Sequence, residues 1–583
     1  MTAPAQAGAV VVPARTSRRA RTLLECGALR CVTRAPAKAA AGILGGIGDI
    51  PLRKLRVGVI DLVHKAPTKA LYARVMHANL ASIMPQVVAT WCQQLGHRVD
   101  FVCYTGLEDL TRELPNDCDV VFICGFTQSA QLSYALSNFF RSQGAVTVLG
   151  GPHARCYPED AQKYFDYVLG FTDRPLIQDI LQDCAQHRPL GLHISADRQL
   201  GALPALAERW PFVAKTLEKA PVLKIVPMMS SLGCPYSCPF CIDACVPYQP
   251  LALDSLQADL RFLAQQMPKP RVGWHDPNFG VRFDATLDAI EEAVPPGSVD
   301  FAAESSLAIL TEAHVARLQR NGFKALLPGV ESWYDVGQKS RCGSRQAEER
   351  VQHVSEQINM IMKYVPYVQA NFVLGLDSDV GAEPFELTKK FIDLTPGVFP
   401  GYSLLTAFGR AAPLNLELQL SDRVIPFPFH FLDNNHAMNV RPLNYTWNEF
   451  YDHVIDLQRY SFSRRTMARR FGANRGSLAR WLNFVRGVSS EGSGRLKEFR
   501  RLRRQLDIDA ELRAFLDRES DELPKFYADT VRKDLGSLWK WLPEGALHHD
   551  QNAYLETSRR GPITIAATVA EALPDEGMAE AGS

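Results

Sequence analysis

The sequence, 583 residues long, has no large excess of either charge and no long hydrophobic run. Its 64 Lys and Arg residues are balanced by 63 Asp and Glu residues, so the formal net charge is +1. A charge so close to neutral creates no general attraction to nucleic acid or to an anionic membrane, and nucleic acid is not expected as a partner. No apolar run approaches the ~20 residues that a helix needs to cross a bilayer, so no membrane span is expected.

Cysteine is also scarce over most of the chain. There are 13 cysteines, an odd number, and they are spread thinly outside residues 234–245. A secreted disulfide framework pairs an even number of cysteines at short spacings, so this distribution argues against one. We therefore expect a reducing compartment, with the cytoplasm as the default.

The two ends of the chain lack the pattern of a packed core. Residues 1–52 are rich in Ala, Arg and small residues and poor in acidic ones, while residues 561–583 are rich in Ala, Glu, Pro and Gly. The composition of the first segment also suits an organelle transit peptide, but a disordered arm is the simpler interpretation. We predict a disordered arm at the start and a disordered tail at the end.

The length predicts two to four domains, and a hydrophobic content of 46% with 22% charged residues is typical of a soluble globular protein. We predict an α/β domain over residues 53–190, a linker over 191–222 and a second α/β domain over 223–410. A mixed and then helical region is expected over 411–560.

The first α/β domain shows strands that alternate with helices. Apolar runs predict strands at 55–61, 98–104, 119–124 and 146–149, and helical patterns cover 84–95 and 129–142. This alternation predicts a doubly wound, Rossmann-like parallel sheet. Ligands of such sheets bind beyond the carboxyl ends of the strands.

The second α/β domain repeats a strand and a helix six times. Helical patterns between the strands include 253–266 and 310–321. The predicted strands are 224–230, 271–275, 299–303, 324–328, 367–374 and 402–407. Six repeats predict a partial, TIM-like β/α barrel with its chemistry at the carboxyl ends of the strands.

Cys234, Cys238 and Cys241 follow the first of these barrel strands directly. A [4Fe–4S] cluster usually takes four Cys thiolates, one on each iron. Three thiolates from one short loop would leave the fourth iron open to a small molecule. The alternatives are a structural zinc loop with Cys245 as the fourth ligand, or chance clustering; no second CxxC or HxxxH follows, which argues against zinc.

The triplet resembles the signature of the radical S-adenosylmethionine (SAM) superfamily. This resemblance implies a [4Fe–4S] cluster on Cys234, Cys238 and Cys241, with SAM on the open iron. It also implies an electron donor such as flavodoxin or ferredoxin. One electron then cleaves SAM to a 5′-deoxyadenosyl radical, which removes hydrogen from a small-molecule substrate.

The run that contains Gly150, Gly151 and His153 resembles the Gly-Gly-Pro-His-Ala run of a cobalamin-binding domain. That domain precedes the radical SAM domain in a large subfamily, and the resemblance implies that these residues contact cobalamin. Glycines also let the backbone approach a flat ligand closely, although a plain tight turn explains them equally well.

The N-terminal domain departs from the subfamily in two places. His64 is one residue out of register with the Asp-x-His-x-x-Gly motif that supplies a lower ligand to cobalt, and the Gly of that motif is missing. The usual Gly-Glu after the last strand is replaced by Gly170 and Phe171. We therefore expect bound cobalamin to lack a histidine ligand from the protein.

The resemblance also suggests residues for SAM. Glu331, at the end of the fourth barrel strand, would bind the amino group or ribose of SAM, because a carboxylate accepts hydrogen bonds from either. Asp276 would contact SAM or the substrate, and Arg345 would pair with the SAM carboxylate, a role for which Lys339 and Arg341 compete. A helix cap is the alternative for Glu331, and a turn is the alternative for Asp276.

Several other polar residues at or beyond the barrel are weaker candidates. They include ribose contacts, neighbours of the adenine and proton or hydrogen donors to the substrate. Glu304 and Ser305 are the ribose candidates, Gly375 would leave space for the adenine, and His436 or Tyr445 would be the donor. Asn371 and Asp377 bracket the end of a strand, and Asp377 is expected either to face the cavity by strand alternation or to lie in a solvated loop.

A run of arginines in the C-terminal region is interleaved with aromatic residues. Such a run suits an acidic partner, RNA or an anionic membrane, but a solvated helix face with Arg stems over apolar surface is the preferred interpretation. The arginines are Arg464, Arg465, Arg469, Arg470, Arg475, Arg480 and Arg486.

Together these features predict a radical SAM enzyme that activates a C–H bond. If cobalamin is bound, the resemblance implies methyl transfer to carbon. The alternatives are a cobalamin-free radical SAM enzyme for rearrangement, cyclisation or redox chemistry, a non-catalytic iron–sulfur protein, and a catalytically idle scaffold.

Overall fold

The computed structural model describes residues 53–186, 191–196, 200–244, 246–334, 346–434 and 437–553. The arm and the tail predicted at the two ends lie outside these ranges. So do five residues with predicted roles, and those roles stay predictions. They are Cys245, Lys339, Arg341, Arg345 and His436.

The N-terminal domain is built on a six-stranded sheet with the order β2-β1-β3-β4-β5-β6, in which neighbouring strands are parallel. The order reverses between β1 and β3, so the predicted doubly wound sheet is confirmed. Its strands are β1 (Arg56–Leu62), β2 (Arg98–Tyr104), β3 (Val120–Gly125), β4 (Val146–Gly150), β5 (Tyr167–Leu169) and β6 (Leu192–Ile194).

Helices cover both faces of this sheet, which is why the central strands are almost continuously apolar. Helix α3 ends at Gln94, and Gly96 follows with a φ of +89°, the left-handed conformation expected after a helix end. The helices are α2 (Leu71–Met76), α3 (Ile83–Gln94), α4 (Leu110–Glu113), α5 (Ala130–Ser142), α6 (Pro152–Cys156), α7 (Pro158–Ala161) and α8 (Arg174–Gln186). Short 3-10 turns lie at His77–Leu80 and Thr127–Ser129.

The segment predicted as a linker, 191–222, has structure of its own. Strand β6 pairs with β5 at the edge of the N-terminal sheet. Helix α9 (Leu206–Lys219) packs against α3 of the N-terminal domain and against α10 of the next domain. The segment therefore joins the two domains by packing and is more than a connection.

The second domain is a six-stranded parallel sheet whose strands follow one another in chain order, so the predicted partial barrel is confirmed. Its strands are β7 (Ile225–Met228), β10 (Arg271–Trp274), β11 (Asp300–Ser306), β12 (Phe323–Glu331), β13 (Tyr367–Leu374) and β14 (Phe399–Leu404). Strand β14 begins three residues earlier than predicted, at Phe399 instead of 402. Pro400 is tolerated there because β14 lies at the end of the sheet.

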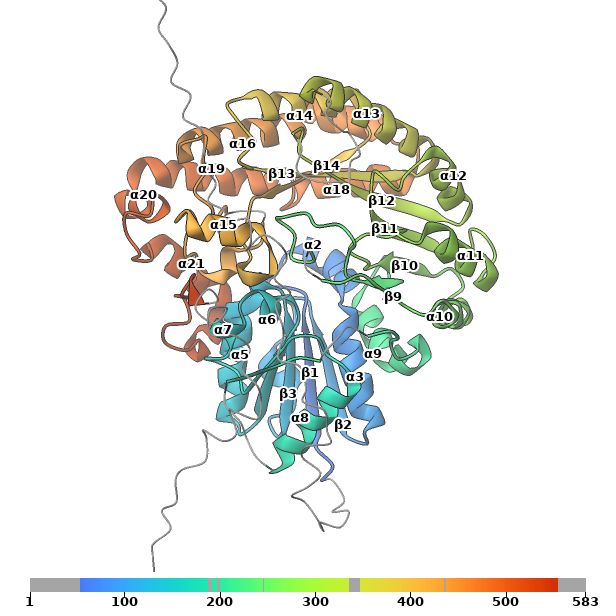
Figure 1. Ribbon diagram of the computed structural model, residues 1–583, viewed down its shortest axis with the longest axis vertical. Coiled ribbons are helices and arrows are strands. Elements are labelled where there is room, and N and C mark those ends of the chain that lie inside the picture. The colour runs from blue at the N-terminus through green and yellow to red at the C-terminus, as the bar shows by residue number, and fades with distance from the viewer. Residues whose placement is uncertain are drawn as a thin grey trace, which may run out of the picture.

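Helices cover the outer face of the barrel sheet (Figure 1). They are α10 (Leu253–Gln266), α11 (Phe283–Ala293), α12 (Glu312–Arg320), α13 (Ala347–Tyr364) and α14 (Glu383–Leu394). On this face Trp274 stacks on Phe301, and Phe372 packs against Phe391 of α14. Large aromatic side chains therefore fill the space between this face and its helices.

The opposite, concave face carries small residues in register with one another. Gly273 is aligned with Ala302 and Ala302 with Ala325, while Gly329 is aligned with Asn371, which is aligned with Gly401. Residues aligned across parallel strands point to the same face. The concave side of β10–β12 therefore carries mostly small side chains, with Glu304 and Leu327 as the larger ones.

The C-terminal helices run along the side of the barrel and down to the N-terminal domain (Figure 1). Asn138 of α5, for example, donates a hydrogen bond to the Trp541 carbonyl at 2.9 Å. These helices are α15 (Leu414–Leu420), α16 (Trp447–Ser461), α17 (Arg464–Ala473), α18 (Ser477–Val488), α19 (Ser493–Ile508), α20 (Ala510–Leu516) and α21 (Lys525–Leu535). Short 3-10 turns lie at Gly409–Ala411, Phe429–Phe431 and Gly536–Trp541.

The arginine run is only in part the solvated helix face that we preferred. Arg470 is buried and donates to the Val398 carbonyl at 2.7 Å, and Arg486 lies over the ring of Phe399 with its guanidinium carbon 4.2 Å from the ring centre. Arg464 and Arg465 do face solvent. The inner arginines hold the C-terminal helices against the last barrel strand, because a guanidinium satisfies several carbonyls at once.

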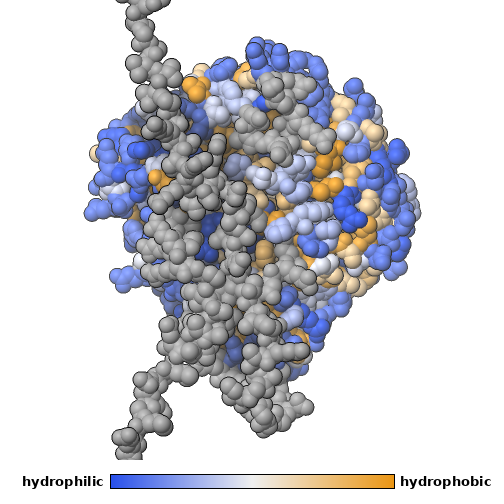
Figure 2. Space-filling model, in the orientation of Figure 1, coloured by the Kyte–Doolittle hydropathy of each residue, from blue (hydrophilic) through white to orange (hydrophobic). Residues whose placement is uncertain are grey.

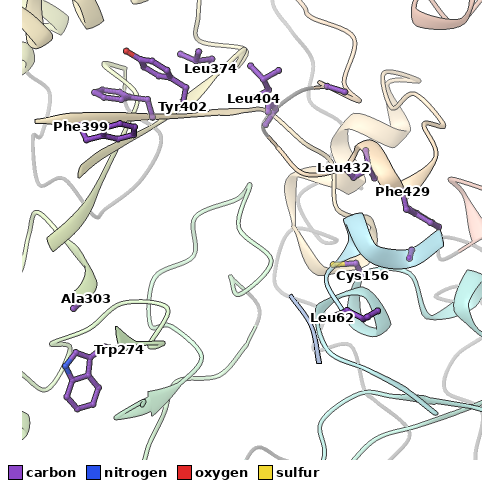
Figure 3. Packing of buried hydrophobic residues seen from close by; sticks show 14 of the residues in the cluster. Leu62, Cys156, Trp274, Ala303, Leu374, Phe399, Tyr402, Leu404, Phe429 and Leu432 are labelled. Atoms are coloured by element: carbon purple, nitrogen blue, oxygen red, sulfur yellow. The ribbon is translucent and has the colours of Figure 1, made fainter. Parts of the chain in front are cut away.

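Buried hydrophobic residues continue from one domain to the other. Figure 3 shows Trp274 and Ala303 on the barrel side and Leu62 and Cys156 in the N-terminal domain, with Phe429 close to Cys156.

The face in Figure 2 is largely hydrophilic where it is coloured. Within the described ranges, no helix is both long and apolar enough to cross a membrane.

Candidate functional site

A small hairpin closes the base of the cysteine loop. Strand β8 (Ser231–Leu232) pairs with β9 (Gln249–Pro250) in antiparallel orientation. Gly233 follows with a φ of +66°, and a Cβ atom there would run into the carbonyl oxygen of Pro247. The loop can therefore start only with glycine at this position.

The three cysteines sit on this loop, at the carboxyl end of β7. Cys234 and Cys238 are buried and Cys241 is half-buried. The Cys241 amide donates to the Cys238 carbonyl at 3.0 Å, and the Asp243 amide lies 3.5 Å from the Cys241 sulfur. Helix α15 begins against the loop, where the Leu414 amide donates to the Pro239 carbonyl at 2.8 Å. The loop is thus held from both sides.

Three cysteine sulfurs on one loop are a donor set that suits an iron–sulfur cluster. Across the described part of the chain, no group of three Cys, His, Asp or Glu side chains is arranged to hold one metal ion. In a [4Fe–4S] cube each thiolate binds a different iron, so its ligands stand apart from one another. The zinc alternative depends on Cys245, which lies outside the described residues.

Asp276 lies directly under the cysteine loop. Its buried carboxylate accepts hydrogen bonds from the Ser230 amide at 3.0 Å and from the hydroxyls of Ser230 and Ser231 at 2.6 and 2.8 Å. Burial raises the pKa of this carboxyl group. Asp276 therefore ties the end of β7 to the end of β10 and fixes where the cysteine loop starts.

Glu331 ends β12 in an unusual conformation. Its φ of +66° lies in the left-handed region, and the pairing with β13 shifts register between Gly329 and Glu331. Its carboxylate folds back to the place that a Cβ atom on Gly329 would take. Such strain is typical of functional sites. The next described helix, α13, has Gln346 at its N-cap, so Glu331 does not cap that helix.

Two of the weaker candidates contact the segment that follows the barrel. Asp377 forms a two-pronged ion pair with Arg423, with both distances 2.7 Å, and its place facing the cavity stays a prediction. The space beside Gly375 is taken by Met438 and Phe450, so it cannot accept an adenine as expected. Both residues serve the packing of the segment that follows the barrel.

The other weaker candidates divide between packing and the open side of the barrel. Ser305 donates to the Phe279 carbonyl at 2.9 Å and is buried, and the Tyr445 hydroxyl donates to the Gly381 carbonyl at 2.9 Å. Asn371 accepts a hydrogen bond from Gln369 at 2.6 Å. Glu304 is exposed at the end of β11, aligned with Leu327 on the concave face.

A cavity of about 360 Å³ connects the cysteine loop with the N-terminal sheet. It lies at the carboxyl ends of β3, β4 and β5, beside the switch point where ligands of doubly wound sheets bind. Gly150 and Gly151 line it; Gly150 faces open space, and Gly151 has a φ of +92° and packs on Cys124. Much of the lining is apolar and includes Met84, Val88, Phe122, Phe126, Leu169 and Phe171.

Two histidines considered from the sequence do not line this cavity. His153 is fully buried beside Tyr134, with its Nε2 atom 2.7 Å from the hydroxyl, and burial lowers its pKa to about 3. The Nδ1 atom of His64 lies 2.6 Å from the Ala66 carbonyl, its ring stacks on His77, and burial lowers its pKa to about 4. Both rings are used in packing.

Sequence reasoning missed His275, which does line the cavity. It follows β10 directly, and burial lowers the pKa of His275 to about 4, so the ring is neutral at physiological pH. No hydrogen bond to this ring is formed within the described part of the chain. The available signal was its place at a strand end, one residue before Asp276.

Sequence reasoning also missed the polar group that fills the far side of the barrel. Arg486 of α18 donates to Glu491 at 2.6 Å, to the Gln369 side chain at 2.5 Å and to the Tyr367 hydroxyl. Tyr72 of α2, from the N-terminal domain, donates to the same Glu491. Three parts of the chain therefore meet at the concave face of β13.

The sequence is similar to two curated enzymes of Chlorobaculum tepidum. It is 24% identical to bacteriochlorophyllide d C-12(1)-methyltransferase over 376 residues, which is 63% of this chain and 79% of that enzyme. It is 32% identical to bacteriochlorophyllide d C-8(2)-methyltransferase over 133 residues, which is 22% and 28% of the two chains. No protein-family model matches the chain.

Among solved structures, the cobalamin-dependent S-adenosylmethionine radical enzyme OxsB has a similar fold. Its apo form matches with a TM-score of 0.53 at 11% identity, covering 87% of this chain and 83% of OxsB. The form with aqua-cobalamin and S-adenosylmethionine bound matches with a TM-score of 0.50 at 12% identity, covering 87% and 81%. The predicted fold, a doubly wound parallel sheet followed by a partial β/α barrel, is shared with OxsB and is confirmed.

Proposed function

We propose that this chain, which has the fold of cobalamin-dependent radical SAM enzymes, is a radical SAM enzyme with a [4Fe–4S] cluster on Cys234, Cys238 and Cys241. The observation that carries the proposal is the hairpin-closed loop with three cysteine sulfurs, set at the carboxyl end of a barrel strand. When bound, the cluster supplies the electron that cleaves SAM to a 5′-deoxyadenosyl radical, which removes hydrogen from a small-molecule substrate.

The concave face of the barrel would receive SAM. Small residues on β10–β12 leave room there, and Glu331 presents its carboxylate at the end of β12. A carboxylate accepts hydrogen bonds from an ammonium group or a ribose diol. In this proposal Asp276 positions the cysteine loop, and Arg345 supplies a positive charge for the SAM carboxylate.

The cavity at the N-terminal sheet would hold part of a cobalamin. Its apolar lining and the bare backbone at Gly150 suit a flat ligand, and it opens toward the cysteine loop. When bound, cobalamin supplies a methyl group, which makes methyl transfer to a carbon atom the proposed reaction. The similarity to two methyltransferases supports this step.

His64 would not bind the cobalt. Its Nδ1 atom is engaged with a backbone carbonyl, its ring stacks on His77, and it does not line the cavity. We therefore propose that cobalamin is held without an imidazole ligand from His64. The electron for SAM cleavage would come from outside the chain, from a donor such as flavodoxin or ferredoxin.

Anaerobic reconstitution of the full chain tests the proposal. We expect about four irons per chain, as in one [4Fe–4S] cluster, and 5′-deoxyadenosine by chromatography after addition of SAM and a reductant. Iron binding without 5′-deoxyadenosine would indicate a non-catalytic iron–sulfur protein. Absence of both would refute the proposal.

The cobalamin part needs its own measurement. Protein loaded with cobalamin under anaerobic conditions should retain the cofactor's visible absorption after desalting, and Gly150→Phe should lose it because a ring would fill the open space. SAM cleavage by a protein that never retains cobalamin would leave the radical SAM function intact and remove methyl transfer.

A further inference from the structure

An ion pair joins the N-terminal domain to the cysteine loop. Arg155 lies on α6, just after the glycines that line the cavity, and Asp243 lies two residues after Cys241. The Arg155 Nη2 atom is 3.0 Å from the Asp243 Oδ1 atom, and about three quarters of each side chain is shielded from solvent. Both residues also line the cavity.

The arginine end of this pair is anchored independently of the loop. The Tyr157 hydroxyl, just after α6, donates to the Ala407 carbonyl at 3.0 Å, and Glu159 forms an ion pair with Arg410. Gly409, which has a φ of +55°, packs directly on the Cys156 carbonyl. The backbone that carries Arg155 is therefore held by contacts with the segment that follows β14, independently of Asp243.

The aspartate end is part of the cysteine loop. The Asp243 amide approaches the Cys241 sulfur at 3.5 Å, and the Asp243 carbonyl accepts a hydrogen bond from the Val246 amide at 3.1 Å. A change in the position of the Asp243 side chain therefore also shifts the backbone beside the Cys241 sulfur. Hydrogen bonds to cluster sulfurs and nearby charges are two of the properties that set the potential of an iron–sulfur cluster.

We propose that Arg155 and Asp243 are positioning residues that hold the Cys241 end of the loop and balance the charge beside the cluster. The inference rests on the proposed function, because it requires a cluster on Cys241. Reduction adds a negative charge to the cluster, so the balance of this pair affects its potential.

The two partners are expected to shift the reduction potential of the cluster in opposite directions when they are neutralised. Arg155→Gln leaves the Asp243 carboxylate without its partner, so reduction becomes harder and the cluster potential becomes more negative. Asp243→Asn leaves the Arg155 guanidinium uncompensated, so the potential becomes more positive. A merely structural role would loosen the loop in both variants and would not shift the potential in opposite directions.

The experiment is a redox titration of the anaerobically reconstituted full chain, followed by electron paramagnetic resonance of the reduced cluster. Arg155→Lys keeps the charge and should shift the potential least. The exchanged pair Arg155→Asp with Asp243→Arg should recover iron content relative to either single exchange. Arg112→Gln, which removes an exposed arginine 85% open to solvent, is the control and should behave as wild type.

The outcomes separate this inference from the proposed function. Opposite shifts with iron content close to wild type support it. Equal or absent shifts in variants that still hold iron and cleave SAM overturn the inference alone. If the single variants lose iron, failure of the exchanged pair to recover it also overturns the inference. A wild-type chain that binds no iron overturns the proposed function and this inference with it.

Discussion

The two halves of the barrel sheet differ in the side chains that they place on the concave face. On β10–β12 that face is built mostly from small residues such as Gly273, Ala302 and Ala325, and Glu304 and Leu327 are its larger side chains. On β13 the same face carries Tyr367 and Gln369, which Arg486 covers from the C-terminal helices. The chain closes one half with its own side chains and keeps the half beside the cysteine loop open. The open half is therefore where a ligand is to be expected.

Loss of any loop cysteine should have the largest effect. Cys234→Ala, Cys238→Ala and Cys241→Ala should each abolish SAM cleavage, because each removes the proposed ligand of one iron. Iron content and 5′-deoxyadenosine formation measure this. Cys118→Ala, at the opposite end of the N-terminal sheet from the cavity, should retain both.

Cys245 tests the open fourth iron. Cys245→Ala should keep most SAM cleavage, since a fourth thiolate would close the site that SAM needs. If that variant loses iron and activity together, Cys245 is a ligand and the open-site proposal is wrong.

A substitution in the closed half, at β13, should lower the free energy of unfolding. Arg486→Ala leaves the half-buried Glu491, which lies near Tyr72 and Tyr367, without its cation, and breaking a largely buried pair costs roughly 3 kcal/mol. Urea unfolding measures this. Arg469→Ala breaks an exposed pair with Asp393 and should cost about 1 kcal/mol or less. Equal costs would mean that the network under β13 is no more important than a surface pair.

Adjacent alanines on β11 separate the two faces directly. Ala303 is buried on the helix side, so Ala303→Leu should destabilise the fold by about 1–3 kcal/mol through overpacking. Ala302 faces the open side, so Ala302→Leu should leave the unfolding free energy almost unchanged and weaken SAM binding instead. Equilibrium binding of SAM to the reconstituted protein, with urea unfolding of both variants, measures the contrast. The reverse pattern would mean that the two faces have been exchanged.

Much of this architecture follows from the sequence, and the exceptions have physical reasons. Runs such as that of β3 are apolar throughout because helices cover both faces, so their strands were predicted to within one or two residues. Strand β6 is only three residues long and carries too little periodicity to detect. The role of Arg486 depends on partners up to 119 residues away, so a local pattern of Arg and aromatic residues cannot show that it points inward.

The candidate site was predictable to a similar degree. The cysteine spacing is a local signal and predicted the loop. Asp276 was found, but its partners Ser230 and Ser231 lie 46 and 45 residues away, so its positioning role required the fold. His275 had only its place at a strand end as a signal, and the Arg155–Asp243 pair carries no local signal, because each matters only where two domains meet.

A smaller effect is expected from Glu331→Gln. The substitution keeps the shape of the side chain at the end of β12 but removes the charge that would pair with an ammonium group. SAM affinity should fall about tenfold, which corresponds to roughly 1.4 kcal/mol, while the unfolding free energy changes little. Unchanged affinity, measured by titration of the reconstituted protein with SAM, would exclude Glu331 from the SAM site.

The smallest expected effect is on the titration of two histidines, His275, which lines the cavity, and His153, which is packed in the core. Burial lowers the pKa of His275 to about 4 and that of His153 to about 3. Both values lie below the usual 6.5. Above pH 6.5 both rings are neutral in the folded and unfolded states, so the pKa shifts do not change the free energy of unfolding. As the pH drops from 6.5 toward the folded pKa of each ring, the unfolded state binds protons first and stability falls. NMR of histidine-labelled protein should place both pKa values well below 6.

A ligand that fills the cavity should then change the titration of His275, which lines it, and leave His153, which is packed against Tyr134, unaffected. A His275 pKa near 6.5 that does not respond to cobalamin would show that the ring faces solvent and not the ligand space.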